Sequence, residues 1–260
     1  MNEPSRRGLK WERDELVLAF ELYCTIDGSN RENNPQVMDL SRAIHRDAGA
    51  VKMKLENFKK FDPGYTADGR KGLGNAGGLD GEIVSEFINN WGGLLSEAEN
   101  ARRKYSIMPE HEIIAGEFSI PEGRYKERIV KVRQGDRLFR KMLLSQYQRK
   151  CCITGLAIED LLKASHIKPW CESDDIGEKV NPQNGLLLNA FFDSAFDKGY
   201  ITIDLDHRVV LSRAIKDTNQ STRSYFEKYE GRHITLPTQP IFRPGKQFIK
   251  YHNEHIFVDG

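Results

Sequence analysis

The sequence has no apolar run near the roughly 20 residues that are needed to cross a membrane. Of its 260 residues, 30% are charged and 38% hydrophobic. Its first residues, MNEPSRRGLKWERDE, also lack the apolar core of a secretory signal. We therefore expect a soluble, cytoplasmic protein with no membrane partner.

Cysteine is scarce, which limits the kinds of stabilising site that the chain can contain. The four cysteines are Cys24, Cys151, Cys152 and Cys171, and no two of them form a C-x-x-C pair. This spacing argues against a disulfide framework and against a zinc ribbon. Reduced thiols are the expected state.

A strong net charge is also missing, because the formal value is only +1. A uniformly basic surface is therefore excluded, but the charge is unevenly placed. The segment from Arg124 to Lys150 holds ten lysine and arginine residues against Glu127 and Asp136. This local excess suits a polyanion such as DNA. A solvated helical face with acidic neighbours explains it equally well.

The length of the chain exceeds the usual 100 to 200 residues or so of one domain, so we expect two. Residues 1–106 should form a helical domain, 107–125 a polar connector, and 126–260 a mixed domain of helices and strands. The overall fold class is therefore α+β. Helical spacing of apolar residues in the first domain is found at 11–24, 35–46, 50–60 and 82–106.

The helices at 35–46 and 50–60 have the outline of a helix-turn-helix. The second of them would present Lys52, Lys59 and Lys60 to a phosphate backbone. An ordinary helical bundle with solubilising lysines is the equal alternative. The glycine-rich stretch that follows, 61–81, contains a G-x-G-x-x-G match from Gly72 to Gly77. Because a helix precedes this match, and not a strand, it does not predict a dinucleotide site.

The second domain begins with an amphipathic basic helix and continues in short pieces. In chain order we expect a helix at 136–148, strands at 151–154, 164–167 and 186–188, a helical turn at 159–162, a helix at 190–198 and a hairpin at 201–210. Residues 241–257 have a mixed pattern that fits either helix or strand. Phe191, Phe192 and Phe196 are expected in the core.

Three polar residues in this domain are expected to converge. His166 ends one predicted strand, Asn184 precedes its partner strand, and Asp193 lies on the helix that follows. An imidazole beside a metal-binding carboxylate is suited to activating water against a phosphodiester. A lone histidine at a strand end is more often structural, so the surrounding motifs decide the interpretation.

Those motifs resemble the HNH endonucleases of the ββα-metal fold. The chain has Ala164-Ser-His-Ile-Lys-Pro-Trp170, Asn181-Pro-Gln-Asn-Gly-Leu-Leu-Leu188 and Phe196-Asp-Lys-Gly199 in that order. The similarity extends over roughly the second half of the chain. The first half resembles, more loosely, an amino-terminal module of restriction-type HNH proteins.

The resemblance implies a role for each matching residue. His166 would be the general base, Asn184 would pin the loop between the strands, and Asp193 would be a metal ligand. Asp197, one helical turn further, would be a second ligand or a helix-end residue. Mg²⁺ is the expected metal, with Mn²⁺ or Ni²⁺ as alternatives. The products would carry 5′-phosphate and 3′-hydroxyl ends.

Two positions depart from the family's pattern. Ser165 stands where many HNH sites have an acidic or histidine ligand, and a hydroxyl is a weaker ligand for a hard cation. Phe192 stands where the subgroup often has histidine. Zinc binding by Cys151, Cys152 and Cys171 together with His166 is a weaker alternative, because adjacent cysteines chelate one ion poorly.

We therefore predict a metal-dependent HNH endonuclease that hydrolyses DNA, in restriction or antiviral defence. The alternatives are a non-catalytic DNA-binding protein with a degenerate HNH core and an RNA nuclease. A double-strand break would require a homodimer or two binding events. The predicted DNA contacts are Lys52, Lys59, Lys60, Arg137, Arg140, Lys141, Lys168 and Lys198.

Overall fold

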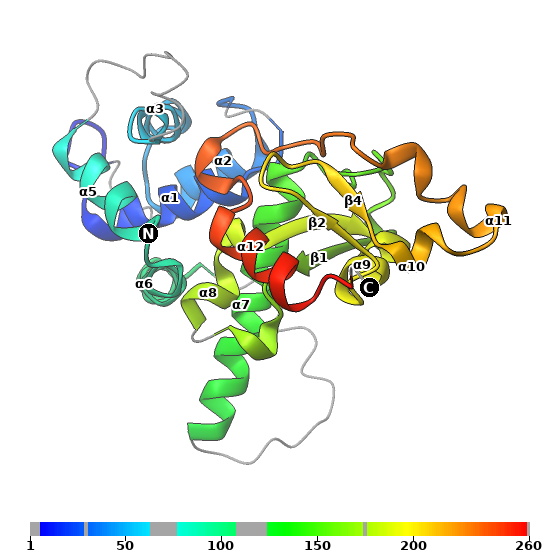
Figure 1. Ribbon diagram of the computed structural model, residues 1–260. Helices are drawn as coiled ribbons and strands as arrows, with labels where there is room; N and C mark the ends of the chain where they lie inside the picture. Colours follow the sequence, from blue (N-terminus) through cyan, green and yellow to red (C-terminus); the bar gives the residue numbers. More distant parts are fainter. Residues whose placement is uncertain (1–5, 29–30, 63–76, 108–123, 174–175, 259–260) are drawn as a thin grey trace. The chain divides into compact units, whose positions relative to one another are not determined.

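The computed structural model divides the chain into two compact units, unit 1 (Met1–Leu138) and unit 2 (Phe139–Gly260). Unit 1 is helical, and unit 2 combines helices with two small antiparallel sheets (Figure 1). In the described residues, no helix is long and apolar enough to span a membrane. The structure describes residues 6–28, 31–62, 77–107, 124–173 and 176–258, with only the helix backbone at 124–131.

Unit 1 is built around its first helix, α1 (Arg13–Thr25), which buries Leu16, Phe20 and Tyr23 almost completely. These residues recur at helical spacing, as the sequence predicts. The buried Glu15 carboxylate binds the guanidinium of Arg46 at 2.8 Å, so the burial of each charge is offset by the other. The other described helices of this unit are α2 (Pro35–Ala43), α3 (Ala48–Lys59), α5 (Gly78–Phe87) and α6 (Trp91–Lys104).

The single helix predicted at 82–106 is wrong, because two helices, α5 and α6, occupy this region. The break falls at Asn90, whose side-chain oxygen accepts a hydrogen bond from the backbone N–H of Gly93 (2.9 Å). Asn90 thereby caps the start of α6, and asparagine is among the best residues for this position. The helices predicted at 11–24, 35–46 and 50–60 are confirmed as α1, α2 and α3.

Unit 2 contains a two-stranded sheet covered by a short helix. Strand β1 (Leu162–His166) pairs antiparallel with β2 (Gly185–Asn189), and His166 lies opposite Gly185. Helix α9 (Ala190–Asp197) follows β2 directly and packs on both strands (Figure 1). The second sheet pairs β3 (Ile201–Ile203) with β4 (Val209–Leu211). The strand, helix and hairpin predictions from residue 164 to residue 210 are thus confirmed.

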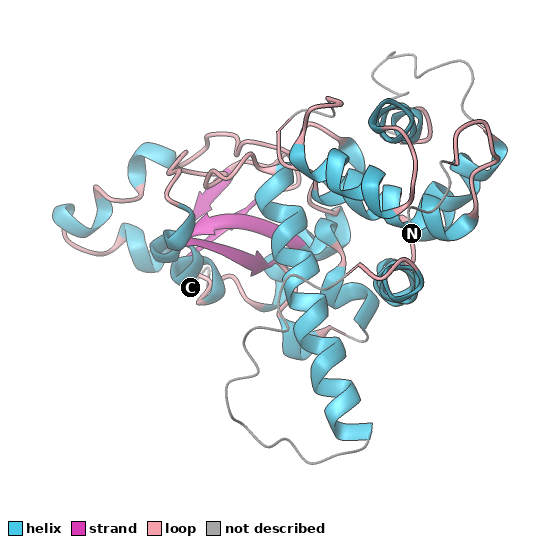
Figure 2. Cartoon of the chain, turned by 180° about the vertical axis from the view of Figure 1, so that it is seen from behind, coloured by secondary structure: helices cyan, strands magenta, loops and turns pink. Residues whose placement is uncertain are grey.

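Helix α7 (Arg124–Gln146) crosses the boundary between the units and is longer than the predicted 136–148. Near the carboxyl end, α12 (Lys246–His255) shows that part of the mixed pattern at 241–257 is helical. Seen from behind, the strands of unit 2 lie among helices and loops of the same unit (Figure 2). The short remaining elements are η1 (Glu159–Leu161), η2 (Trp170–Glu172), α8 (Ile176–Val180), η3 (Pro182–Asn184), α10 (Arg213–Lys216), α11 (Gln220–Arg223), η4 (Glu227–Tyr229) and η5 (Pro240–Phe242).

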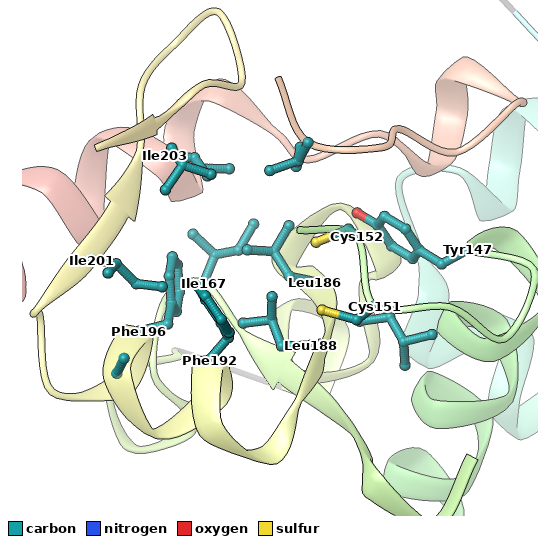
Figure 3. Packing of buried hydrophobic residues seen from close by; sticks show 14 of the residues in the cluster. Tyr147, Cys151, Cys152, Ile167, Leu186, Leu188, Phe192, Phe196, Ile201 and Ile203 are labelled. Carbon is teal, nitrogen blue, oxygen red and sulfur yellow. The ribbon is translucent and has the colours of Figure 1, made fainter. Parts of the chain in front are cut away.

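The core of unit 2 lies between the two sheets and α9. Leu186 and Leu188 of β2, with Phe196 of α9, are fully buried there (Figure 3). Cys151 and Cys152 belong to the same cluster, so their thiols have a packing role. Burial raises the pKa of the Cys152 thiol, which keeps it protonated.

The strand predicted at 151–154 is wrong, because these residues form a turn. The backbone N–H of Gly155 donates to the carbonyl of Cys151 (2.9 Å), and Gly155 has a positive φ of 75°. That conformation suits glycine and reverses the chain before a strand can develop. The Gly72–Gly77 match and the connector predicted at 107–125 lie largely outside the described residues.

Candidate active site

The hairpin of β1 and β2 brings His166 and Asn184 together at one end of the sheet. His166 is the last residue of β1, and Asn184 immediately precedes β2. The backbone N–H of Ile167 donates to the carbonyl of Asn184 (3.0 Å), which extends the pairing by one step. Gly185 is required here, since a Cβ would lie 2.7 Å from side-chain atoms of Phe139 and Leu143 on α7.

The His166 ring is fixed by three neighbours. Its Nε2 lies 2.9 Å from the carbonyl oxygen of Lys179, its face stacks on Phe139 with ring centroids 4.1 Å apart, and its edge meets Trp170. A carbonyl can only accept a hydrogen bond, so Nε2 carries the proton of the neutral ring. The basic nitrogen is therefore Nδ1, the atom that can take a proton from water.

Asn184 is fully buried and holds the ends of the segment between the strands. Its Oδ1 accepts a hydrogen bond from the backbone N–H of Lys168 (2.7 Å). Its Nδ2 donates to the carbonyls of Lys168 (3.2 Å) and Glu178 (3.4 Å). Because Lys179 follows Glu178 and accepts from His166, these bonds position the acceptor of the histidine. The side chain of Asn184 thus links both ends of this segment, and its role in the proposed reaction stays a prediction.

Helix α9 supplies the acidic part of the site. Its start is capped by Asn189, whose side chain accepts from the N–H groups of Phe191 and Phe192. Asp193 and Asp197 are four residues apart and therefore lie on one face of the helix. Burial of its carboxyl group, followed by the negative charge of Asp193, raises the pKa of Asp197 to about 6. The two carboxyl groups thus repel each other at neutral pH.

Ser165 of β1 lies next to the carboxyl group of Asp197. Its hydroxyl is close enough to lower the pKa of Asp197, yet it forms no hydrogen bond of normal geometry with the described residues. The residue is also buried, at 3% exposure. A buried hydroxyl without a partner is costly unless another group satisfies it. The site therefore has an oxygen atom that is available to an additional ligand.

These oxygen atoms fit a small hard cation. Mg²⁺ is commonly held in proteins by one or two carboxylates, with waters and substrate phosphate completing its coordination. Asp193, Asp197 and Ser165 can supply that part. No group of three or more His, Cys, Asp and Glu suited to a metal occurs in the described part of the chain. The zinc alternative with Cys151, Cys152, Cys171 and His166 is therefore wrong.

The aromatic residues of α9 divide between core and surface. Phe192 and Phe196 are buried as predicted, at 4% and 0% exposure. The expectation that Phe191 belongs to the core is wrong, because it is 53% exposed. Phe192 and Phe196 share the inner face by their four-residue spacing, and Phe191 is turned about 100° away from Phe192.

The predicted DNA contacts in unit 1 already have partners. Lys52 lies 3.5 Å from Glu32, and Lys59 pairs with Glu56 at 2.8 Å. The ammonium of Lys60 lies 5.8 Å from the ring centroid of Phe61. A phosphate would have to compete with those carboxylates, although such surface pairs are weak, typically below about 1 kcal/mol.

The predicted contacts on α7 and in unit 2 differ in their surroundings. Arg140 donates to the carbonyls of Leu162 (2.8 Å) and Glu159 (3.3 Å), which ties α7 to the start of β1. Lys168 pairs with Glu178 at 2.8 Å. Arg140 and Lys168 thus stabilise strand β1 and the loop that follows it, which carry the proposed catalytic residues. The remaining three, Arg137, Lys141 and Lys198, have exposed side chains.

The raised pKa of Asp197 predicts how the fold responds to pH. The ordinary value is 3.8 and the folded value about 6, so ionisation is less favourable in the folded chain. The carboxylate destabilises the fold above about pH 6, and this cost disappears below about pH 4. The Asp197 side chain as a whole is exposed, although its carboxyl group is partly desolvated, so solvent screening limits the effect to about 1 kcal/mol. In EDTA, Asp197→Asn should therefore raise Tm near neutral pH by roughly 1–3 °C. The gain should vanish near pH 4.

Differential scanning fluorimetry at the two pH values measures this effect. The exposed Asp217 is a matched control, and Asp217→Asn should leave Tm unchanged at both. Equal gains for Asp197→Asn at neutral and acid pH would contradict the assigned repulsion. Added Mg²⁺ or Mn²⁺ should stabilise the wild type more than Asp197→Asn, because the ion offsets the same repulsion.

Residues 151–204 match the family model described as HNH endonuclease. This range contains β1, β2, α9 and β3, and with them His166, Asn184, Asp193 and Asp197. A search of curated proteins found no significant match.

Proposed function

Because residues 151–204 match the family model described as HNH endonuclease, we propose that the chain is a divalent-metal-dependent endonuclease that hydrolyses phosphodiester bonds of DNA. The observation that carries this proposal is the hydrogen bond from His166 Nε2 to the Lys179 carbonyl, at 2.9 Å. It fixes the tautomer in which Nδ1 is the proton acceptor. A general base must have this protonation state before the reaction begins.

The residues of unit 2 have separate tasks in this reaction. Nδ1 of His166 takes a proton from water as the water oxygen attacks phosphorus and the bond from phosphorus to the 3′ oxygen breaks. Phe139 and the Lys179 carbonyl keep the imidazole in place during the transfer. Asn184 keeps that carbonyl at its position through Glu178. The leaving 3′ oxygen takes up a proton from solvent, so the products carry a 5′-phosphate and a 3′-hydroxyl.

Asp193, Asp197 and Ser165 would hold the divalent metal. When bound, the ion supplies positive charge that stabilises the extra negative charge on the phosphate and the leaving oxygen. Without it, the two carboxylates would repel the phosphodiester. Binding of Mg²⁺ by them is supported by the oxygen-only donor set, which suits this ion better than zinc. Mn²⁺ and Ni²⁺ are the alternatives.

Restriction or antiviral defence is the setting that we propose, since the motifs resemble those of restriction-type HNH proteins. One site cuts one strand, so a monomer should produce nicked circles before linear DNA, and a homodimer could produce linear DNA directly. Target choice by unit 1, through Lys52, Lys59 and Lys60, remains a prediction.

A plasmid-nicking assay tests the activity. Supercoiled DNA incubated with the protein and Mg²⁺, Mn²⁺ or Ni²⁺ should be converted to nicked circles, and EDTA should abolish the conversion. A single-stranded RNA of similar length, tested in parallel, separates a DNA nuclease from an RNA nuclease. Retained DNA binding without cutting in any of the three metals would instead indicate a non-catalytic DNA-binding protein.

A further inference from the structure

Unit 2 has an open hollow on its surface that the proposed catalytic residues do not use. Its volume is about 430 Å³, within the roughly 300–1,000 Å³ of small-ligand sites. It lies between the turn at 154–156, the first turn of α9 and the segment around η4. Its wall includes Leu156, Phe191, Phe192, Tyr225, Lys228 and Tyr229.

Two aromatic side chains of this wall are unusually exposed. Phe191 is 53% and Tyr225 64% exposed, and their ring centroids lie 5.9 Å apart. Phe226 is buried behind them and stacks on Phe191 at 5.2 Å. The exposed rings are therefore supported from the core side and open to solvent. Adjacent exposed aromatic residues are typical of a binding surface.

The hollow also contains a cation that is available to a ligand. The ammonium of Lys228 lies 4.9 Å from the ring centroid of Tyr229. In the described structure it has no carboxylate partner, whereas neighbouring Lys216 and Arg223 pair with Glu230 and Glu227. The hollow thus combines apolar ring surfaces with one positive charge. A nucleotide has the complementary parts, a planar base and a phosphate.

We propose that this hollow binds an unpaired nucleobase of the nucleic acid substrate, with Lys228 near the adjoining phosphate. The inference rests on the proposed nuclease function and adds a substrate-binding site to it. Stacking of a base on Phe191 and Tyr225 requires no particular base, because every base has a π-face. The site therefore favours single-stranded or locally opened DNA over closed duplex.

The geometry of α9 relates the hollow to the acidic site. At about 100° per residue, Phe191 and Asp193 project from the helix about 160° apart, on opposite flanks. A helix with its side chains is about 10–12 Å across. The hollow and the acidic site are therefore separated by about the width of this helix.

Fluorescence anisotropy in EDTA tests this site without any cutting. The probes are a 12-residue oligothymidine, a 12-residue strand without bases, and a 12-base-pair duplex. Phe191→Ala and Tyr225→Ala should each weaken binding of oligothymidine by roughly 5- to 100-fold. Binding of the strand without bases should be weak already and unchanged by the substitutions. Phe191→Tyr should retain binding, because it keeps a ring.

Tyr200→Ala is the matched control, since Tyr200 is 43% exposed and does not line the hollow. It should leave every affinity within about twofold. Unchanged oligothymidine binding in Phe191→Ala and Tyr225→Ala, an equal loss with the strand without bases, or no measurable binding by the wild type would overturn the proposal. Nicking in Mg²⁺ is measured in a separate assay. A failure of this binding site would therefore not count against the catalytic proposal, and a failure to nick would not count against this site.

Discussion

Replacing His166 by alanine should lower the nicking rate by about 10²- to 10⁴-fold, the usual contribution of a general base. The imidazole Nδ1 is the proton acceptor in the proposed mechanism, because Nε2 donates to the Lys179 carbonyl. Alanine removes the acceptor but leaves the DNA-binding surface. Binding of DNA in EDTA should therefore change by less than about threefold, while the rate in Mg²⁺ falls. The plasmid assay and an anisotropy titration measure the two quantities.

His233→Ala is a matched control for this substitution. His233 is also a histidine whose ring nitrogen contacts a backbone carbonyl, that of Asp206 (3.0 Å), but it lies outside the hairpin of β1 and β2. Its replacement should leave the nicking rate within about twofold. Added imidazole should restore part of the rate in His166→Ala, and a loss that is purely structural would not respond to it. Equal rates for the wild type and His166→Ala would remove His166 from the mechanism.

The hairpin and its helix were predictable because each has a local signal. Pro169 follows the apolar strand that ends at His166, and Asn184 precedes a glycine that allows the tight approach of α7. The four-residue spacing of Phe192 and Phe196 identifies the inner face of α9. These signals are short-range, so one sequence is enough to give the element types in this region.

The partner that orients His166 could not be predicted. The acceptor is the backbone carbonyl of Lys179. Because every residue has such a carbonyl, no sequence pattern identifies this one. Phe139, which stacks on the ring, was expected on a basic helix, but nothing in the spacing shows that its ring would lie against His166. Both contacts depend on how segments far apart in the chain come together.

Ser165 was expected to weaken the metal site, because a hydroxyl is a poorer ligand than a carboxylate. The structure adds that this hydroxyl is buried beside Asp197 and lacks a hydrogen-bond partner in the described residues. Burial of this kind is a tertiary property, and it follows from the packing of α9 on β1. Ser165 therefore remains a candidate metal ligand, which its residue type alone would not predict.

Asn184→Ala should markedly lower the stability of the fold. The side chain is fully buried and forms three hydrogen bonds with the backbone of Lys168 and Glu178. Its removal leaves these partly buried backbone groups without that partner, at about 0.5–1.5 kcal/mol for each hydrogen bond. We expect a total of about 2–4 kcal/mol and a fall in Tm of roughly 5–15 °C. Thermal unfolding followed by circular dichroism measures it.

Asn181→Ala is the matched control, because the Asn181 side chain accepts one hydrogen bond in the described structure, from the N–H of Gln183, and the residue is only partly buried. Its cost should remain near 1 kcal/mol. Asn184→Asp keeps the acceptor for the Lys168 N–H but places a buried negative charge against two carbonyls, so it should be at least as destabilising as alanine. Similar Tm values for Asn184→Ala and Asn181→Ala would show that the loop does not depend on these bonds. The Lys179 carbonyl would then need another support, and the proposed link from Asn184 to the histidine tautomer would fail with it.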